Sequence, residues 1–337
     1  MSFVLRDRRL TSVVLLHELR RPRRLEFKRV GTTFTLTLPR PEADRLEYLL
    51  ELRSRGSGMR VGPDPTNPLR AHGPFGEKSV IEFRGYEPPD WVLDDEAPAG
   101  HVQELTLGSR PLGTTLSVLL WSPADTDAQR RLPLLVVHDG PEYDRYSSLT
   151  RLLDHLVSFG ETPDFRALLL PSGPVRNELY SASTRYADAL AVELLPQALR
   201  HAPSEEQLVF LGASLGAVAA LHAYVRHPEL AGGLFLQSGS FFRRRFDAHE
   251  AGFYRFARIT RFVSRVHGRL PLAPPVPTVL TCGTAEENLA NNRALAEALE
   301  LRGWPLKTLW NRDAHNWTSW RDSLQPYLAE LLVRVWS

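Results

Sequence analysis

A serine flanked by glycines is the feature of this sequence that points most directly to chemistry. Gly212, Ser214 and Gly216 form a G-x-S-x-G motif between the apolar run QLVFL at 207–211 and the helical run LGAVAALHAYV at 215–225. Glycine on both sides removes the Cβ atoms that would clash in a tight strand-to-helix turn. Such a turn exposes the hydroxyl and directs a helix N-terminus toward a developing oxyanion. We therefore predict that Ser214 is a nucleophile, with an accidental motif at a Gly/Ala-rich helix start as the alternative.

A serine hydroxyl is a weak nucleophile at neutral pH and needs a general base. His315 is the predicted base, because it lies in RDAHNW between the last expected strand and the last expected helix. His267 lies in the basic stretch RFVSRVHGRL, which is typical of a solvated helix. His222 and His227 are five residues apart and miss the spacing for a shared metal, so we predict no metal site.

The base in turn needs a carboxylate that orients it. The run CGTAEEN at 282–288 follows the apolar run PTVLT, and a carboxylate there can reach His315 from the side opposite the serine. Glu286 and Glu287 are both candidates, and we favour Glu286; either acid could instead stabilise the first turn of the following helix. Asp313 is a weaker candidate because it is only two residues from the histidine.

Two backbone N–H groups must stabilise the oxyanion that forms when a serine attacks a carbonyl. Leu215, directly after the serine, is predicted to supply one of them. The other is expected from the loop after LLVVH, where Pro141 has no N–H and Gly140 is therefore the candidate. An ordinary turn glycine is the alternative interpretation of Gly140.

From residue 101 onward, short apolar runs alternate with helical runs. This alternation predicts a mostly parallel sheet covered by helices on both faces, and together with the serine turn it indicates an α/β-hydrolase fold. Strands are expected at 101–108, 115–123, 132–140, 165–173, 207–214, 231–239, 277–283 and 305–313, and helices at 147–159, 183–199, 215–227, 288–303 and 318–336.

The first 100 residues follow a different pattern. β-rich runs at 11–21, 34–39 and 45–53 are separated by turn residues, among them the Gly56-Ser57-Gly58 break, which predicts a small antiparallel sandwich. The prolines and acids of 86–100 are typical of a linker. We therefore expect two domains, residues 1–100 and 101–337, as the chain length also favours.

The composition is that of a soluble globular protein, with 43% hydrophobic and 24% charged residues and a net charge of +2. That small charge gives no reason to expect a nucleic acid or a membrane surface as partner, and no run approaches the roughly 20 apolar residues that span a bilayer. The single cysteine, Cys282, excludes an internal disulfide. With a charged N-terminus in place of a signal peptide, we expect a cytoplasmic location.

The segment 194–242 resembles the core of the enterochelin (enterobactin) esterases and their esterase relatives. In that family the serine motif is followed by H-P-E and by Q-S-G-S, found here at 227–229 and 237–240. The loop of His315, with Trp317 and a later W-R pair, is also similar to the family's histidine loop. The resemblance covers about residues 105–335, although Ala217 stands where relatives commonly have a second glycine.

This resemblance implies a serine esterase that cleaves a small-molecule ester through an acyl-enzyme, with no cofactor. Some members act on ferric catecholate siderophores, which are strongly anionic. It therefore implies substrate contacts from Arg176 and Glu178 of an R-x-E-L segment, from Trp317, and from Arg243 and the two arginines that follow it. The first domain resembles the immunoglobulin-like domains that precede some esterases.

Three functions remain open on these grounds. The first is ester hydrolysis, with a catecholate trilactone as one candidate substrate. The second is acyl transfer to an alcohol by the same triad. The third is a non-catalytic binding protein on a hydrolase scaffold, which the complete set of serine, glutamate and histidine disfavours. The oligomeric state cannot be inferred from the sequence.

Overall fold

The computed structural model describes residues 1–19, 24–56, 58–94, 96–204 and 207–337. Four parts of the expected pattern lie outside these residues: the end of the β-rich run 11–21, Ser57 of the glycine break, Asp95 of the expected linker, and residues 205–206 of the segment 194–242. The chain forms two compact units. The sandwich unit comprises Met1–Glu87, Gly283–Leu289 and Trp310–Ser319, and the α/β unit comprises Pro88–Cys282, Ala290–Leu309 and Trp320–Ser337.

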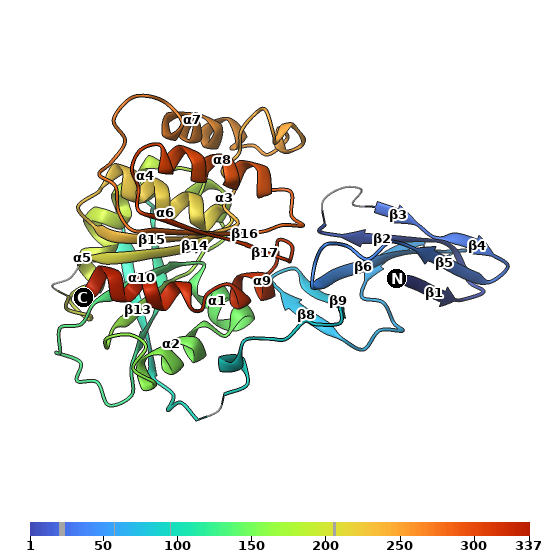
Figure 1. Cartoon of the computed structure of the whole chain (residues 1–337), viewed down its shortest axis with the longest axis horizontal. Helices are drawn as coiled ribbons and strands as arrows, with labels where there is room; N and C mark the ends of the chain where they lie inside the picture. The colour runs from blue at the N-terminus through green and yellow to red at the C-terminus, as the bar shows by residue number, and fades with distance from the viewer. Residues whose placement is uncertain (20–23, 57, 95, 205–206) are drawn as a thin grey trace. The chain divides into compact units, whose positions relative to one another are not determined.

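The N-terminal part of the sandwich unit consists of two antiparallel sheets around one core (Figure 1). In β1, Phe3 and Leu5 are buried while their neighbours are exposed, because alternate side chains of a strand point to opposite faces. The rings of Phe3 and Tyr48, from different sheets, pack edge to face at 5.2 Å. One sheet has the order β1 (Ser2–Arg6), β5 (Thr33–Thr37), β4 (Lys28–Val30), and the other β3 (Arg24–Glu26), β2 (Leu10–His17), β6 (Arg45–Ser54), β9 (Gly76–Glu82), β8 (Arg70–Gly73), with β7 (Gly58–Gly62) paired to β6.

An eight-stranded mixed sheet forms the centre of the α/β fold, as the alternating pattern predicts. Its first two strands are antiparallel, and the pairs from β13 to β16 are parallel. The order is β10 (His101–Ser109), β11 (Thr114–Ser122), β13 (Arg166–Leu170), β12 (Leu134–His138), β14 (Leu208–Ala213), β15 (Ala231–Gln237), β16 (Thr278–Gly283), β17 (Leu306–Asn311).

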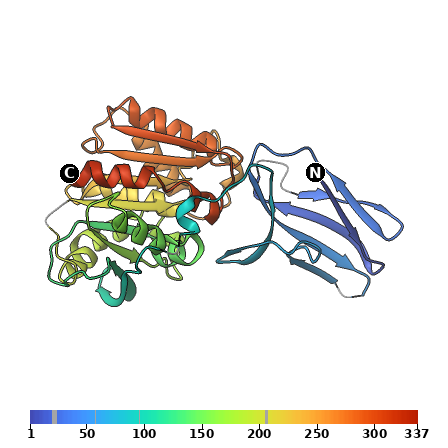
Figure 2. The same ribbon diagram turned by 60° about the horizontal axis from the view of Figure 1, so that its bottom comes forward.

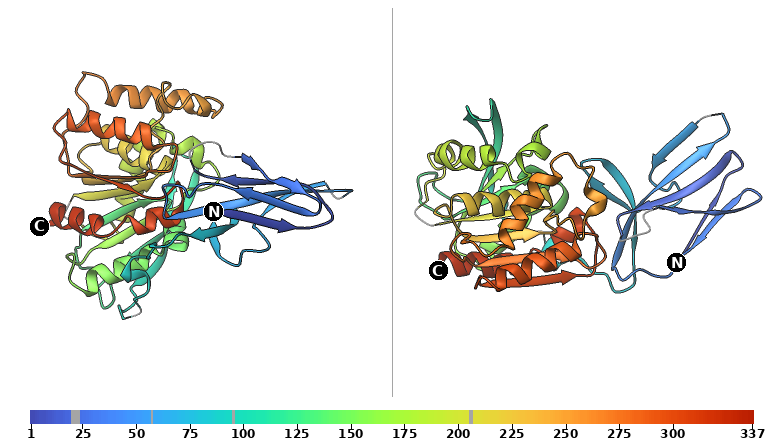
Figure 3. Two further views of the ribbon diagram at one scale, coloured as in Figure 1. Left: turned by 45° about the vertical axis from the view of Figure 1, so that its right-hand side comes forward. Right: turned by 90° about the horizontal axis from the view of Figure 1, so that it is seen from above.

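Helices cover both faces of this sheet, and Figures 2 and 3 show the layers from further directions. Every residue of β12 to β16 is buried, because these apolar runs have helices on either side. One face carries α1 (Gly140–Ser147), α2 (Leu149–Ser158) and α10 (Tyr327–Trp336), and the other carries α4 (Thr184–Ala189), α6 (Leu215–Arg226), α7 (Phe256–Val266) and α8 (Leu289–Glu300) (Figure 1).

Two expected helices are interrupted, in each case near a proline. The run 183–199 forms α4, a π-helical segment at Leu190–Leu194 and α5 (Leu195–Ala198), since Pro196 has no N–H for the regular helical pattern. The run 318–336 forms α9 (Trp317–Asp322) and, after Pro326, α10. The short helices α1 and α3 (Arg176–Leu179) were not among the expected elements.

The segment expected as a linker contains a 3₁₀ turn, Asp90–Val92, in which Trp91 is 1% exposed. Near it, Arg151 of α2 donates to the carbonyl of Asp94. Among the described residues, no helix combines the length and the apolar character that crossing a membrane requires.

Candidate active site

Ser214 occupies the turn between β14 and α6 with φ 56° and ψ −120°. Residues other than glycine rarely adopt a positive φ, and such strain is concentrated at functional sites. The flanking glycines permit the turn: a Cβ on Gly212 would lie 2.5 Å from the carbonyl carbon of Gly216. A Cβ on Gly216 would lie 3.3 Å from the Cβ of His138. The backbone thus has the nucleophile-elbow geometry that the motif predicts.

The hydroxyl of Ser214 lies beside a second serine, which the sequence did not single out for a role. The Oγ atoms of Ser214 and Ser240 are 3.2 Å apart, and the Ser240 N–H donates to the Ser214 carbonyl at 3.1 Å. Ser240 is the last residue of the Q-S-G-S segment after β15. The recurrence of this segment in the family singled it out in the sequence. It did not indicate that the hydroxyl of Ser240 contacts that of Ser214.

Gln237 and Gly239 of the Q-S-G-S segment form buried hydrogen bonds with the surrounding helices. Gln237 accepts from the Tyr143 hydroxyl at 2.7 Å and donates to the Trp320 carbonyl at 3.0 Å. The side-chain amide of Asn292 bonds both the N–H and the carbonyl of Gly239. These buried bonds tie the loop after β15 to the helices on both sides of the sheet.

The loop after β16 carries Glu286, which is completely buried and paired with His315. Glu286 Oε2 lies 2.5 Å from His315 Nδ1, and Glu286 Oε1 accepts the Gly283 N–H at 2.7 Å. A Cβ on Gly283 would lie 2.3 Å from the Asp313 carbonyl oxygen, so the close approach of the two loops requires glycine here. A carboxylate fixed in this way can hold an imidazole in one orientation and one tautomer.

The two other acids considered for the triad differ from Glu286 in their surroundings. Glu287 is half-buried. Asp313 is buried and accepts from the Ala314 N–H at 2.7 Å and from the Asn316 amide at 3.2 Å. Burial raises the pKa of Asp313 to about 7, although the nearby Arg45 opposes this shift. Asp313 therefore organises the loop on both sides of His315.

The two residues predicted to stabilise an oxyanion each begin a helix. Leu215 is the first residue of α6, directly after Ser214. Gly140 is the first residue of α1 and follows Asp139, whose φ is 57°. A Cβ on Gly140 would lie 2.4 Å from the Cα of Leu169, so close packing against β13 also requires glycine at this position.

The R-x-E-L segment has internal charge partners. Arg176 forms a bidentate pair with Asp139, with Nε to Oδ1 at 2.8 Å and Nη2 to Oδ2 at 2.6 Å. Asp139 thus compensates the positive charge of Arg176, which the family resemblance implied would contact substrate. Glu178 accepts from Arg258 at 2.8 Å and also pairs with Arg255.

Beside Glu178, the α/β unit has a hollow of about 790 Å³ that we call the arginine hollow. Arg185 of α4, His222 of α6 and Arg258, Arg261 and Arg265 of α7 line it. Burial, followed by the charges of nearby arginines, lowers the pKa of His222 to about 4, so this histidine is neutral at pH 7. Of the described residues in the lining, Glu178 is the only acid, so the hollow carries an excess of positive charge.

Arg243 and Trp317, also predicted to contact substrate, have different surroundings. Arg243 is half-buried beside Phe246 and lines a separate hollow with His267 and Arg302. Trp317 begins α9 in the sandwich unit, where a Cβ on Gly73 of β8 would lie 3.8 Å from its Cδ1.

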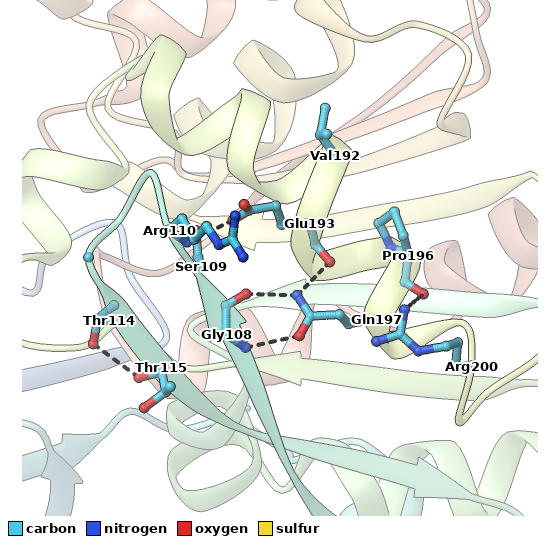
Figure 4. A pocket seen from close by; sticks show the side chains of 11 residues that line it. Gly108, Ser109, Arg110, Thr114, Thr115, Val192, Glu193, Pro196, Gln197 and Arg200 are labelled. Carbon is cyan, nitrogen blue, oxygen red and sulfur yellow. Dashed lines mark hydrogen bonds between the residues drawn. The ribbon is translucent and has the colours of Figure 1, made fainter.

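A further hollow lies between the β10–β11 turn and the helical segment 190–198 (Figure 4). The side chain of Gln197, which lines this hollow, joins its two sides, because it accepts the Gly108 N–H at 3.0 Å and donates to the Gly108 carbonyl at 2.7 Å. None of the residues predicted to act in catalysis lines this hollow.

Comparisons with known proteins find esterases. The family model described as "Putative esterase" matches residues 109–331. The iron(III) enterobactin esterase of Dickeya dadantii is 31% identical over 150 residues, which cover 39% of this chain and 34% of that protein. The enzyme of the same name from Escherichia coli O6:H1 is 27% identical over 307 residues, 86% of this chain and 72% of that protein.

The fold is also that of a solved enterobactin esterase. The crystal structure of ferric enterobactin esterase from Salmonella typhimurium superposes with a TM-score of 0.78 at 19% identity, over 98% of this chain and 92% of that one. This likeness confirms the predicted fold class, an α/β-hydrolase preceded by a β-sandwich. The chain is similar to the iron(III) enterobactin esterases, and from the match of the family model over residues 109–331 it belongs to the esterase family.

Proposed function

We propose that this protein is a serine hydrolase of carboxylic esters, with Ser214 as the nucleophile. The observation that carries the proposal is the strained turn at Ser214, where φ 56° and ψ −120° at the N-terminus of α6 present a hydroxyl at a helix end. Strained backbone conformations of this kind are concentrated at functional sites. The pair of buried Glu286 and half-buried His315 supports the same chemistry.

In the proposed mechanism, His315 takes the proton of the Ser214 hydroxyl while Oγ attacks the ester carbonyl. The oxyanion of the tetrahedral intermediate accepts bonds from the N–H groups of Leu215 and Gly140. His315 then gives the proton to the departing alkoxide, which leaves an acyl-enzyme and a free alcohol. Water, deprotonated by His315, attacks the acyl-enzyme, and His315 returns this proton to Ser214 Oγ as the bond to the acyl group breaks and the acid is released. Glu286 keeps the imidazole oriented in both halves of the reaction.

For the substrate we propose an anionic ester of the siderophore type, a catecholate trilactone. The names of the Dickeya and Escherichia relatives support this class. We assign its anionic groups to the arginine hollow, where Arg185, Arg261 and Arg265 are exposed and, among the described residues, in no ion pair. None of the residues proposed for catalysis lines this hollow, so the assignment rests on its charge. Arg176 contributes less net charge, since Asp139 compensates it. The cytoplasmic location expected from the sequence stays a prediction.

Active-site labelling tests the proposal. We expect a fluorophosphonate probe to form one adduct, located on Ser214 by mass spectrometry, and to leave Ser214→Ala unlabelled. Ser264→Ala, which removes an exposed hydroxyl on α7, is the matched control and should label normally. Absence of labelling on the folded protein, or an adduct on another serine, would overturn the assignment.

A panel of esters then tests the reaction class. Acyl groups from acetyl to aromatic, and a catecholate siderophore, should be cleaved to the free acid. Transfer of the acyl group to an added alcohol in preference to water would indicate the acyltransferase instead. Binding without turnover of any ester would indicate the non-catalytic protein.

A further inference from the structure

We propose that the β-sandwich positions the histidine of the active site, through Asp44 and Arg45 at the start of β6. The inference rests on the proposed function, since it assigns His315 a part in ester cleavage. Segments 283–289 and 310–319, which carry Glu286 and His315, form one compact unit with residues 1–87. The contacts within this unit show how the sandwich holds them.

The first contact joins Asp44 to Arg312 by both backbone and side chain. The Asp44 N–H donates to the Arg312 carbonyl at 2.6 Å, and Arg312 Nε lies 3.1 Å from Asp44 Oδ1. The Asp44 carbonyl in turn accepts the Phe83 N–H at 3.0 Å. The segment 310–319, which carries His315, is therefore bonded to Asp44, and Asp44 is itself bonded to Phe83 after β9.

The second contact is electrostatic. The Arg45 side chain is 5% exposed, and its guanidinium lies 3.4 Å from Glu47, 3.8 Å from Glu82 and 3.9 Å from Asp313. Asp313 accepts from the N–H of Ala314 and from the amide of Asn316, the two neighbours of His315. A buried charge whose partner is removed is costly, so Arg45 and Asp313 restrain each other's positions.

The loop that carries Glu286 is bonded to the same segment, 310–319. The Ala285 N–H donates to the Asp313 carbonyl at 3.1 Å, and the Thr284 N–H donates to the Asn311 carbonyl at 2.7 Å. Movement of the histidine segment would therefore move the loop of Glu286 as well. Arg45 reaches the segment of His315 through Asp313, so we assign it the part of a positioning residue.

Arg45→Met tests this role, because methionine is similar in length and removes the charge. A misplacement of about 1 Å in an active site can cost about 100-fold in rate. We expect kcat for a small neutral ester to fall about 10- to 100-fold with KM nearly unchanged. Arg45→Lys, which restores a cation, should recover most of the lost kcat. The rate of fluorophosphonate labelling at Ser214 should fall in parallel with kcat.

Arg53→Met is the matched control, because Arg53 is on the same strand and pairs with Glu51 at 3.2 Å. It should keep the kcat of the parent. If Arg45→Met does not fold, Arg312→Ala removes the exposed partner of Asp44 and should lower kcat by a smaller factor, with the melting temperature unchanged. The inference would be overturned if Arg45→Met had the same kcat as the control Arg53→Met. Where Arg45→Met does not fold, the same comparison applies to Arg312→Ala. A parent that neither labels nor cleaves esters would instead refute the proposed function.

Discussion

His315 Nδ1 lies 2.5 Å from Glu286 Oε2, and the second oxygen of this carboxylate accepts the Gly283 N–H. Both oxygens of Glu286 are thus engaged, and the side chain has 0% exposure. The carboxylate can rotate little, so the imidazole that it holds has one favoured tautomer.

Replacement of this acid should be far more harmful than replacement of its neighbour. Glu286→Gln puts an amide beside Nδ1 and should lower kcat by about 10³- to 10⁴-fold, as expected when the acid of a triad is neutralised. Glu287→Gln is the matched control and should stay near the parent. Steady-state kinetics on one ester measures both losses of kcat. A larger loss for Glu287→Gln would assign the role of the triad acid to Glu287 instead.

Ser240→Ala should slow the reaction modestly without changing the fold. Its Oγ lies 3.2 Å from that of Ser214, and a hydrogen bond of this kind is worth about 1 kcal/mol, which corresponds to roughly fivefold in rate. Single-turnover acylation measures the effect directly. Ser323→Ala, which removes a buried hydroxyl that bonds Gln237, should leave acylation unchanged. An unaffected acylation rate in Ser240→Ala would show that the contact has no part in the reaction.

Asp313 should make the stability of the protein depend on pH. Its pKa is raised from 3.8 to about 7, mainly by burial, so the native state binds this proton more tightly than the unfolded state. The corresponding contribution to stability is fully present below pH ~4 and is lost as pH rises through ~7. Urea denaturation at several pH values should show this loss in the parent and not in Asp313→Asn. Asp164→Asn, at an exposed ion pair with Arg130, should follow the parent, and parallel curves for parent and Asp313→Asn would contradict the prediction.

The arginine hollow should favour anionic over neutral esters. In Arg261→Ala/Arg265→Ala, the ratio of kcat/KM for a matched anionic and neutral ester should fall about tenfold, which requires a change of about 1.4 kcal/mol. The preference should shrink with rising salt, since screening weakens exposed charges. Arg244→Ala/Arg245→Ala removes the same number of exposed charges elsewhere. A larger drop in that variant would assign substrate contact to the segment after Arg243 instead.

The sequence predicted those parts of the fold that depend on local pattern. The runs that became β12 to β16 are continuous apolar stretches between helical ones, and their burial follows from that pattern. The turn at Ser214 was predictable because the steric need for Gly212 and Gly216 is also local. No local pattern in the sequence indicates the spatial order of the strands, in which β13 lies between β11 and β12.

Contacts between residues distant in the chain explain what the sequence did not reveal. Arg176 looked like a free cation in its segment, but its partner Asp139 lies 37 residues earlier. Asp44 and Arg312 are separated by 268 residues, and nothing in either neighbourhood indicates the other. The assignment of catalytic roles to Ser214, Glu286 and His315 stays a prediction until the variants are measured.

The backbone at Ser214 has a consequence for how this protein can change over generations. Its φ of 56° with ψ of −120° suits glycine better than serine, and holding another residue there costs about 1–3 kcal/mol. Loss of the hydroxyl through Ser214→Gly would relieve that strain, so an inactive descendant would be more stable than its parent. Under the proposed function, purifying selection on activity would keep a serine here, and lineages released from it would be expected to drift toward glycine at this position.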